Sequence, residues 1–161
     1  MPWKVCNQSF CWMYKVGDIL LIEDYPLPTR EKDKFFIVIG FNKGEFHLLA
    51  MTTSQLYFDI SLVRYGEIKD RELSGFCFPA GHTIGVNNFS FKKHTFISHR
   101  YSIREHNDDF LAHFHVTYQD HLKNKELGDL IYSFYKNEKV KRTYKFELER
   151  ILNELYQDGK I

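Results

Sequence analysis

The sequence predicts an α+β protein that is mainly β, in which a small, strongly curved antiparallel barrel or sandwich is followed by helices. Segments of strand length outnumber helical ones through the first hundred residues and lie close together along the chain. They also lack the long helical crossovers that a parallel sheet needs. The C-terminal third instead shows helical spacing. The 161 residues fit one domain, residues 1–161, with a barrel core at 14–100 and a helical cap at 124–159.

Strands are predicted wherever an apolar or alternating run is bounded by turn-forming residues. These runs are residues 19–22, 35–41, 46–51, 56–63, 76–78 and 89–97. Pro26 and Pro28 must end the first strand, because proline lacks the N–H group that a β-ladder uses. The polar residues 29–34 therefore predict a loop before the second strand, residues 42–45 a tight turn, and residues 67–75 a further polar turn.

Two amphipathic helices are predicted in the C-terminal third. The first carries apolar side chains at helical spacing from Leu127 to Tyr135. The second carries them from Val140 to Leu155 and ends near Gly159, a residue type that commonly terminates helices. We expect these helices to cover the open end of the barrel.

Charge and hydropathy narrow the class of protein. The chain has 22 Lys and Arg against 21 Asp and Glu, so its formal net charge is +1. This balance excludes a strongly basic surface that would bind nucleic acid non-specifically. Any anion site must then be local. No run reaches the roughly 18 to 20 apolar residues that span a bilayer, and the N-terminus lacks the pattern of an export signal. The sequence therefore predicts a cytoplasmic protein without a membrane partner.

The three cysteines suit a reducing compartment, because they are too few and odd in number for a disulfide framework. Cys6, Cys11 and Cys77 form a nominal zinc set with His82. Neither pair has a turn-forming glycine between its members, so buried free thiols are the favoured interpretation. No metal and no other cofactor is predicted.

The eight histidines offer further candidates for chemistry. His94 follows two lysines and could act as a general base near neutral pH. His113 and His115 would share one face if their segment were a strand. A metal site built on them would draw its other ligands from nearby residues: His106, His121, Asp108 and Asp109. An exposed polar face explains the pattern as well, because no third ligand has a diagnostic spacing.

Short motifs follow one another in a fixed order from the first predicted strand. They are Gly17-Asp18-Ile19 before an apolar run, Tyr25 and Pro28-Thr29, Glu31 in the polar loop, Lys34 before the next strand, and Thr52-Thr53 after the third. This ordered series resembles the MazF/PemK family of toxin endoribonucleases, whose fold is a small SH3-like barrel with a C-terminal helix. The match covers about a third of the chain and ends near Val63.

Members of that family cut single-stranded RNA without a metal, by attack of the 2′-hydroxyl on the adjacent phosphate. The resemblance therefore implies the toxin of a toxin–antitoxin pair, a homodimer that needs no cofactor and that a cognate antitoxin neutralises. It assigns catalytic roles to Lys34, Thr52, Thr53 and Glu31. Lys34 stands where the family has arginine, and its ammonium is a compact charge rather than a bidentate clamp. Arg30, in the same loop, is an alternative clamp.

RNA contacts are expected from a set of cations and polar residues: Arg30, Lys32, Gln55, Lys92, Lys93 and His94. Residues 89–96 interleave rings with cations, a combination that suits single-stranded RNA. Alternation places Phe89 and Phe91 on one inward face, so the lysines rather than the rings are expected to contact RNA. The alternative function is a catalytically inactive SH3-like barrel that binds a protein or a nucleic acid.

Overall fold

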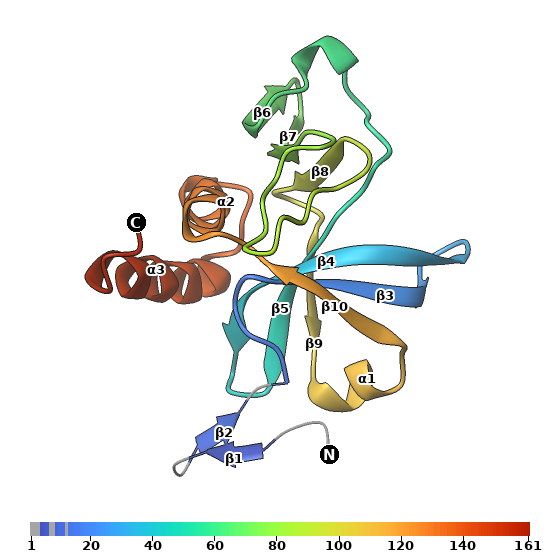
Figure 1. Ribbon diagram of the computed structural model, residues 1–161. Coiled ribbons are helices and arrows are strands. Elements are labelled where there is room, and N and C mark those ends of the chain that lie inside the picture. Colours follow the sequence, from blue (N-terminus) through green and yellow to red (C-terminus); the bar gives the residue numbers. More distant parts are fainter. Residues whose placement is uncertain (1–3, 7–8, 12) are drawn as a thin grey trace.

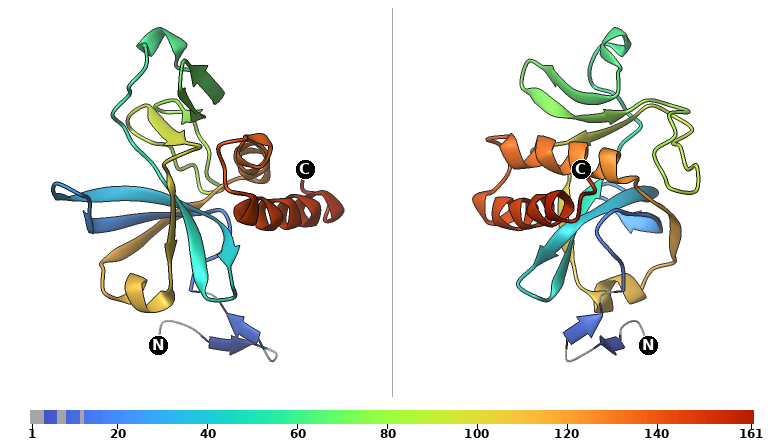
Figure 2. Two further views of the ribbon diagram at one scale, coloured as in Figure 1. Left: turned by 180° about the vertical axis from the view of Figure 1, so that it is seen from behind. Right: turned by 60° about the vertical axis from the view of Figure 1, so that its left-hand side comes forward.

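The chain folds into two antiparallel sheets flanked by helices, which confirms the predicted α+β class (Figures 1 and 2). The computed structural model describes the backbone of residues 4–6, 9–11 and 13–161, and side chains from residue 13 onward. A separate hairpin pairs β1 (Lys4–Cys6) with β2 (Ser9–Cys11). In Figure 1 the smaller sheet lies above the larger one, and the two long helices lie to one side.

The larger sheet has five strands in the order β10-β3-β4-β5-β9. They are β3 (Asp18–Pro26), β4 (Glu31–Asn42), β5 (Phe46–Met51), β9 (Ile103–His106) and β10 (Val116–His121). The predicted polar loop at residues 29–34 is wrong, because β4 already begins at Glu31 and pairs Lys34 with Ile22. The polar residues at the start of β4 can pair with β3 because the hydrogen bonds between two strands are made by the backbone and do not require apolar side chains. Pro26 does end β3, as expected.

The smaller sheet has the order β6-β7-β8, with β6 (Gly66–Asp70), β7 (Leu73–Phe78) and β8 (Thr95–Ser98). The predicted polar turn at residues 67–75 is therefore wrong, because the chain reverses only between β6 and β7, where Arg71 has a φ of 56°. Residues 56–63 form no strand either. They contain the short 3₁₀-helix η1 (Ile60–Leu62), whose preceding Asp59 accepts a hydrogen bond from the Ser61 N–H at 2.8 Å.

The two sheets meet at an isolated antiparallel bridge between Thr53 and Phe96. The Thr53 N–H donates to the Phe96 carbonyl at 2.9 Å, and the Phe96 N–H donates to the Thr53 carbonyl at 2.8 Å. Among the described residues the strands form separate sheets rather than one closed ladder. The closed barrel stays a prediction.

Three α-helices complete the fold: α1 (Asp108–Ala112), α2 (Asn124–Lys136) and α3 (Arg142–Gln157). The last two confirm the pair predicted from the C-terminal spacing. No helix in the described part of the chain is long and apolar enough to span a membrane.

One core joins both sheets to the helices. It contains Ile37 and Leu48 of the larger sheet, Phe78 of the smaller sheet, Phe134 of α2 and Leu148 of α3, all fully buried. The opposite face of the larger sheet packs a second cluster from several elements: Leu20, Ile22, Tyr25, Phe36, Val38, Leu49 and Leu111. Both faces of the larger sheet are therefore buried, which explains why β4 reads as a continuous apolar run.

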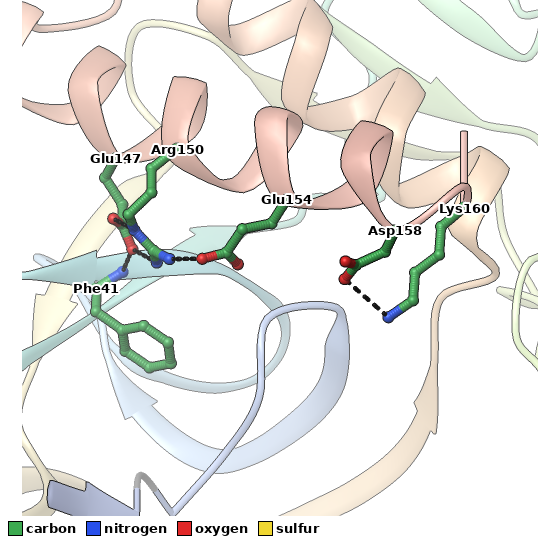
Figure 3. Close-up of polar contacts among 6 residues, drawn as sticks. All are labelled: Phe41, Glu147, Arg150, Glu154, Asp158 and Lys160. Atoms are coloured by element: carbon green, nitrogen blue, oxygen red, sulfur yellow. Dashed lines mark hydrogen bonds and ion pairs between the residues drawn. The ribbon is translucent and has the colours of Figure 1, made fainter.

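Helix α3 also completes the hydrogen bonding of β4 (Figure 3). The Phe41 N–H donates to Oε2 of Glu147 at 2.8 Å. This close approach needs Gly40, because a Cβ atom there would lie 2.7 Å from Cγ of Glu147. Arg150 holds the same carboxylate, with Nε donating to Oε1 at 2.7 Å and Nη2 donating to Oε2 at 2.8 Å.

Candidate functional site

A groove of about 480 Å³ lies where the start of β4, the end of β5 and the segment before β8 meet. Four lysines line it, and we call it the lysine groove: Lys32, Lys34, Lys92 and Lys93. Thr52, the residue that follows β5, also lines it. Asp33 is the carboxylate among its described lining residues, so the groove carries an excess of positive charge. Such a concave, cationic surface favours an anionic ligand.

Lys34 is the most unusual of these cations, because its side chain is only 8% exposed. Burial, together with the nearby charges of Lys32, Arg104 and Arg30, lowers its pKa to about 8. Alternation along β4 places Lys34 and Lys32 on one face of the strand and Phe35 on the other. Residues from both faces of β4 therefore line the groove.

The two threonines lie side by side in the chain but differ in position. Thr52 is buried, and its hydroxyl donates to the Phe35 carbonyl at 3.0 Å. Thr53 does not line the groove, and its hydroxyl accepts a hydrogen bond from the Gln55 N–H at 3.1 Å. The hydroxyl hydrogen of Thr52 is thus engaged, while its oxygen can still accept a hydrogen bond.

The wall opposite β4 is held by Asp120, which is 1% exposed. Its carboxylate accepts backbone N–H groups from Asn87 at 3.0 Å, Phe89 at 3.0 Å and His121 at 2.7 Å. Burial alone would raise the pKa of Asp120, but these hydrogen bonds outweigh burial and lower it. One buried carboxylate therefore fixes the segment that leads to Lys92 and Lys93.

The rings of this wall face the core, as the alternation predicted. Phe91 is 3% exposed, and the ring centroid of Phe35 lies 5.4 Å from that of Phe91 and 6.0 Å from that of Phe89. Residues 89–94 are not in a strand, however, because β8 begins at Thr95. The exposed side chains of this segment are those of Lys92 and Lys93.

Five of the ten predicted site residues do not line the lysine groove. Glu31 lines a different pocket, together with Glu23 and His115. Arg30 is exposed in the β3–β4 connection, and its charge acts on Lys34. The other three face elsewhere: Thr53, Gln55, whose side chain accepts from the Tyr57 hydroxyl, and His94, whose Nδ1 accepts from the Ala80 N–H.

The candidate metal ligands do not converge. Where side chains are described, no group of three or more His, Cys, Asp or Glu residues could hold a metal ion. Cys77 is a buried free thiol whose pKa burial raises, whereas the side chains of Cys6 and Cys11 lie outside the described residues. His82 stacks on Tyr65 with ring centroids 4.9 Å apart.

The histidine pair around Phe114 does not share the face of a strand, because β10 begins only at Val116. His113 caps α1, and its Nδ1 lies 2.6 Å from the Asp109 carbonyl. His115 faces Glu23 at 3.3 Å instead.

Sequence reasoning missed a cluster on the Lys34 face of the sheet. The Tyr25 hydroxyl lies 2.6 Å from Nε2 of His106, and the His106 ring stacks on Phe110 with centroids 3.7 Å apart. Burial lowers the pKa of His106 to about 4, with a further contribution from Arg104. The signal for this cluster was weak, because β9 is only four residues long and its pairing with β5 spans a long stretch of chain.

The arrangement in the lysine groove can bind a phosphate diester and stabilise added negative charge on it. The chain matches none of the protein-family models, curated proteins or solved structures compared with it. Functional conclusions therefore depend on the groove and on the sequence motifs that led to it.

Proposed function

We propose that this protein is an endoribonuclease that cleaves single-stranded RNA without a metal, by attack of the 2′-hydroxyl on the adjacent phosphate. The observation that carries the proposal is the convergence of a buried lysine with three other lysines and a threonine on one groove. Burial disfavours the charged form of Lys34 and lowers its pKa, and a lysine with a lowered pKa in a groove supports a functional role.

The reaction needs a base, positive charge beside the phosphorane and an acid for the leaving oxygen. Lys34 is mostly protonated at neutral pH, and its pKa of about 8 is close to the operating range of a general acid. In the proposed step Asp33 takes the proton of the 2′-hydroxyl, and the 2′-oxygen forms a bond to phosphorus. The bond to the 5′-oxygen then breaks, and Lys34 gives that oxygen a proton. The products are a 2′,3′-cyclic phosphate and a free 5′-hydroxyl.

Asp33 replaces Glu31 in this scheme because of its position. Asp33 lines the lysine groove, whereas Glu31 lines another pocket. The Asp24 N–H donates to the Asp33 carboxylate at 3.0 Å and helps to orient it.

The proposal includes the finer features that the resemblance implies. These are an SH3-like barrel, a homodimer, a cognate antitoxin, and toxin activity in the cytoplasm. The bridge between Thr53 and Phe96 supports the barrel, because it links the two sheets by backbone hydrogen bonds.

The test incubates the purified protein with a long single-stranded RNA in EDTA. We expect cleavage that leaves 2′,3′-cyclic phosphate ends and that Lys34→Ala abolishes. Lys34→Arg, which restores the arginine of the family, should keep part of the activity. Lys69→Ala is the matched control, because Lys69 is exposed on β6 and does not line the groove. Absence of cleavage, or cleavage that survives Lys34→Ala together with Thr52→Ala and Thr53→Ala, rejects the proposal.

The second candidate is an inactive barrel that binds RNA or a protein. The Thr52 hydroxyl favours it, since its hydrogen is donated to the Phe35 carbonyl rather than presented to a ligand. The same samples decide between the two functions. RNA that is retained by the wild-type protein without being cut, and released by Lys34→Ala, identifies the binding module.

A further inference from the structure

A second cationic cavity, of about 460 Å³, lies between the β8–β9 connection and the α2–α3 connection. We call it the arginine–lysine pocket after four of its lining residues: Arg100, Arg104, Lys139 and Lys141. None of the described residues that line it is Asp or Glu, and it shares no lining residue with the lysine groove. Its volume suits a ligand of nucleotide size.

Two of the four cations are held by backbone carbonyls. Nη1 of Arg104 donates to the carbonyl of Tyr101 at 2.7 Å and to that of Ile103 at 3.1 Å. Nζ of Lys139 donates to the Glu72 carbonyl at 2.6 Å. Carbonyl oxygens orient a cation without neutralising it, so Lys139 is positioned while its charge remains available. The Arg104 side chain also interacts with the Tyr25 side chain, and its charge acts on Lys34, so Arg104 lies between the pocket and the Lys34 face of the larger sheet.

Carboxylates offset little of this charge. Ion pairs in the described part of the chain use other cations, such as Lys125, Lys136 and Arg150. Glu105 lies beside the pocket, but its carboxylate accepts the Tyr144 hydroxyl at 2.6 Å and the Asn42 amide at 2.7 Å. Its pKa is lowered mainly by these two hydrogen bonds and more weakly by the charges of Lys43 and Lys141, so Glu105 offsets part of the charge of Lys141.

Helix α3 begins at this pocket in an electrostatically unfavourable way. Its N-cap residue is Lys141, which makes no side-chain capping bond, and its first turn has no acidic residue. Cations repel the positive end of a helix dipole, whereas an anion there is stabilised by the free N–H groups. The cavity, its four cations and the uncapped helix start therefore favour the same ligand charge.

We propose that the arginine–lysine pocket binds the phosphate group of a nucleotide. Tyr101 supplies a surface for the base, because its ring is 65% exposed and lines the same cavity. The guanidinium carbon of Arg100 lies 5.2 Å from the centroid of that ring, so charge and aromatic surface are adjacent. This site does not depend on RNA cleavage in the lysine groove. The nucleotide is either a free mononucleotide or part of an RNA strand.

The test measures binding of AMP, of adenosine and of a five-nucleotide single-stranded RNA to the full chain by calorimetry. The pocket variant carries Arg100→Gln and Lys141→Gln, both exposed positions that should not disturb folding. The control carries Lys69→Gln and Lys160→Gln, which remove the same charge away from the pocket. We expect the pocket variant to weaken binding of AMP or of the RNA at least tenfold, the control to change it less than twofold, and adenosine not to bind.

Loss of AMP binding in the pocket variant identifies a free mononucleotide as the ligand. Loss of RNA binding alone identifies a nucleotide within a strand. Lys92→Gln with Lys93→Gln must leave AMP binding unchanged, which separates this site from the lysine groove; loss of AMP binding in that variant overturns the assignment to this pocket. The proposal is overturned if neither probe binds, if the pocket variant binds as the wild type does, or if the control loses as much affinity.

Discussion

The lysine groove and the arginine–lysine pocket both collect cations, but they hold them differently. The groove places Lys34 on a central strand, where it is 8% exposed and its pKa is lowered to about 8. The pocket places Arg100 and Lys141 in connections at the surface, where both are exposed. A buried lysine can give up a proton near neutral pH, whereas exposed cations on connections can bind charge but are not tuned for proton transfer. This difference is the reason that we propose catalysis for the first region and binding for the second.

The largest expected effect comes from a substitution in the lysine groove alone. Lys34→Ala should lower kcat/KM for RNA cleavage by about 10² to 10⁴, the usual contribution of a general acid. Lys69→Ala should leave kcat/KM unchanged. Steady-state cleavage of a fluorogenic RNA measures both variants, and equal rates for wild type and Lys34→Ala would remove the functional contrast between the two regions.

The second effect concerns the wall of the groove. Asp120→Asn should reduce the free energy of unfolding by about 2–3 kcal/mol, because an amide cannot replace a buried carboxylate that accepts three backbone N–H groups. Since the folded pKa of Asp120 is lowered, its stabilisation is present above the unfolded pKa and is lost as the pH falls.

Urea denaturation at pH 7 and pH 3 checks both statements. Asp158→Asn, an exposed carboxylate that lies 3.9 Å from Lys160, is the matched control and should change stability by less than about 0.5 kcal/mol. A loss as small as that of the control would show that Asp120 does not hold the wall.

A third prediction concerns the salt dependence of RNA binding by the lysine groove. Lys92→Gln with Lys93→Gln should weaken binding of single-stranded RNA about tenfold, and should flatten the slope of log K against log salt by about 1.4, since each lost phosphate contact removes about 0.7. Lys69→Gln with Lys160→Gln should leave the slope unchanged. Fluorescence anisotropy between 50 and 200 mM salt measures it, and parallel slopes would place the RNA elsewhere.

The smallest effect is on stability and has the opposite sign from most core mutations. Lys34→Met should raise the free energy of unfolding by about 1–2 kcal/mol at pH 7, because it removes a buried charge. The folded pKa of about 8 lies below the unfolded value of 10.5, so the unfolded chain binds more protons between them. Wild-type stability from this group should therefore rise with pH over that range. Urea denaturation at pH 7 and pH 10 should show the gain of Lys34→Met disappearing; an equal gain at both values would assign it to packing.

The sequence predicted the elements that lie fully in the core. The apolar spacing of α2 and α3 and the runs in β3, β4 and β5 produced those elements, because burial and backbone period agree there. Alternation predicted a strand at residues 56–63, and this prediction is wrong. Phe58 packs against Phe96 there, although the backbone of the segment pairs with no strand. Alternation reports which side chains are buried and does not require a paired backbone.

The site was predictable only in part for a related reason. Lys34 and Thr52 were found through motifs that lie close together in the chain, and both line the groove. The arginine–lysine pocket joins Arg104 with Lys139, which meet only because the α2–α3 connection lies beside the β8–β9 connection in the fold. Local spacing has no signal for such a meeting, so it could be recognised only from the folded chain.

The carboxylate of Glu147 at the Phe41 N–H also sets an order of events during synthesis. The ribosome makes β4 long before α3, so the backbone of β4 near Phe41 lacks this hydrogen-bond partner while more than a hundred residues are added. Gly40 keeps the space for Glu147 open during that time. The larger sheet therefore gains this hydrogen bond only after the last helix has left the ribosome.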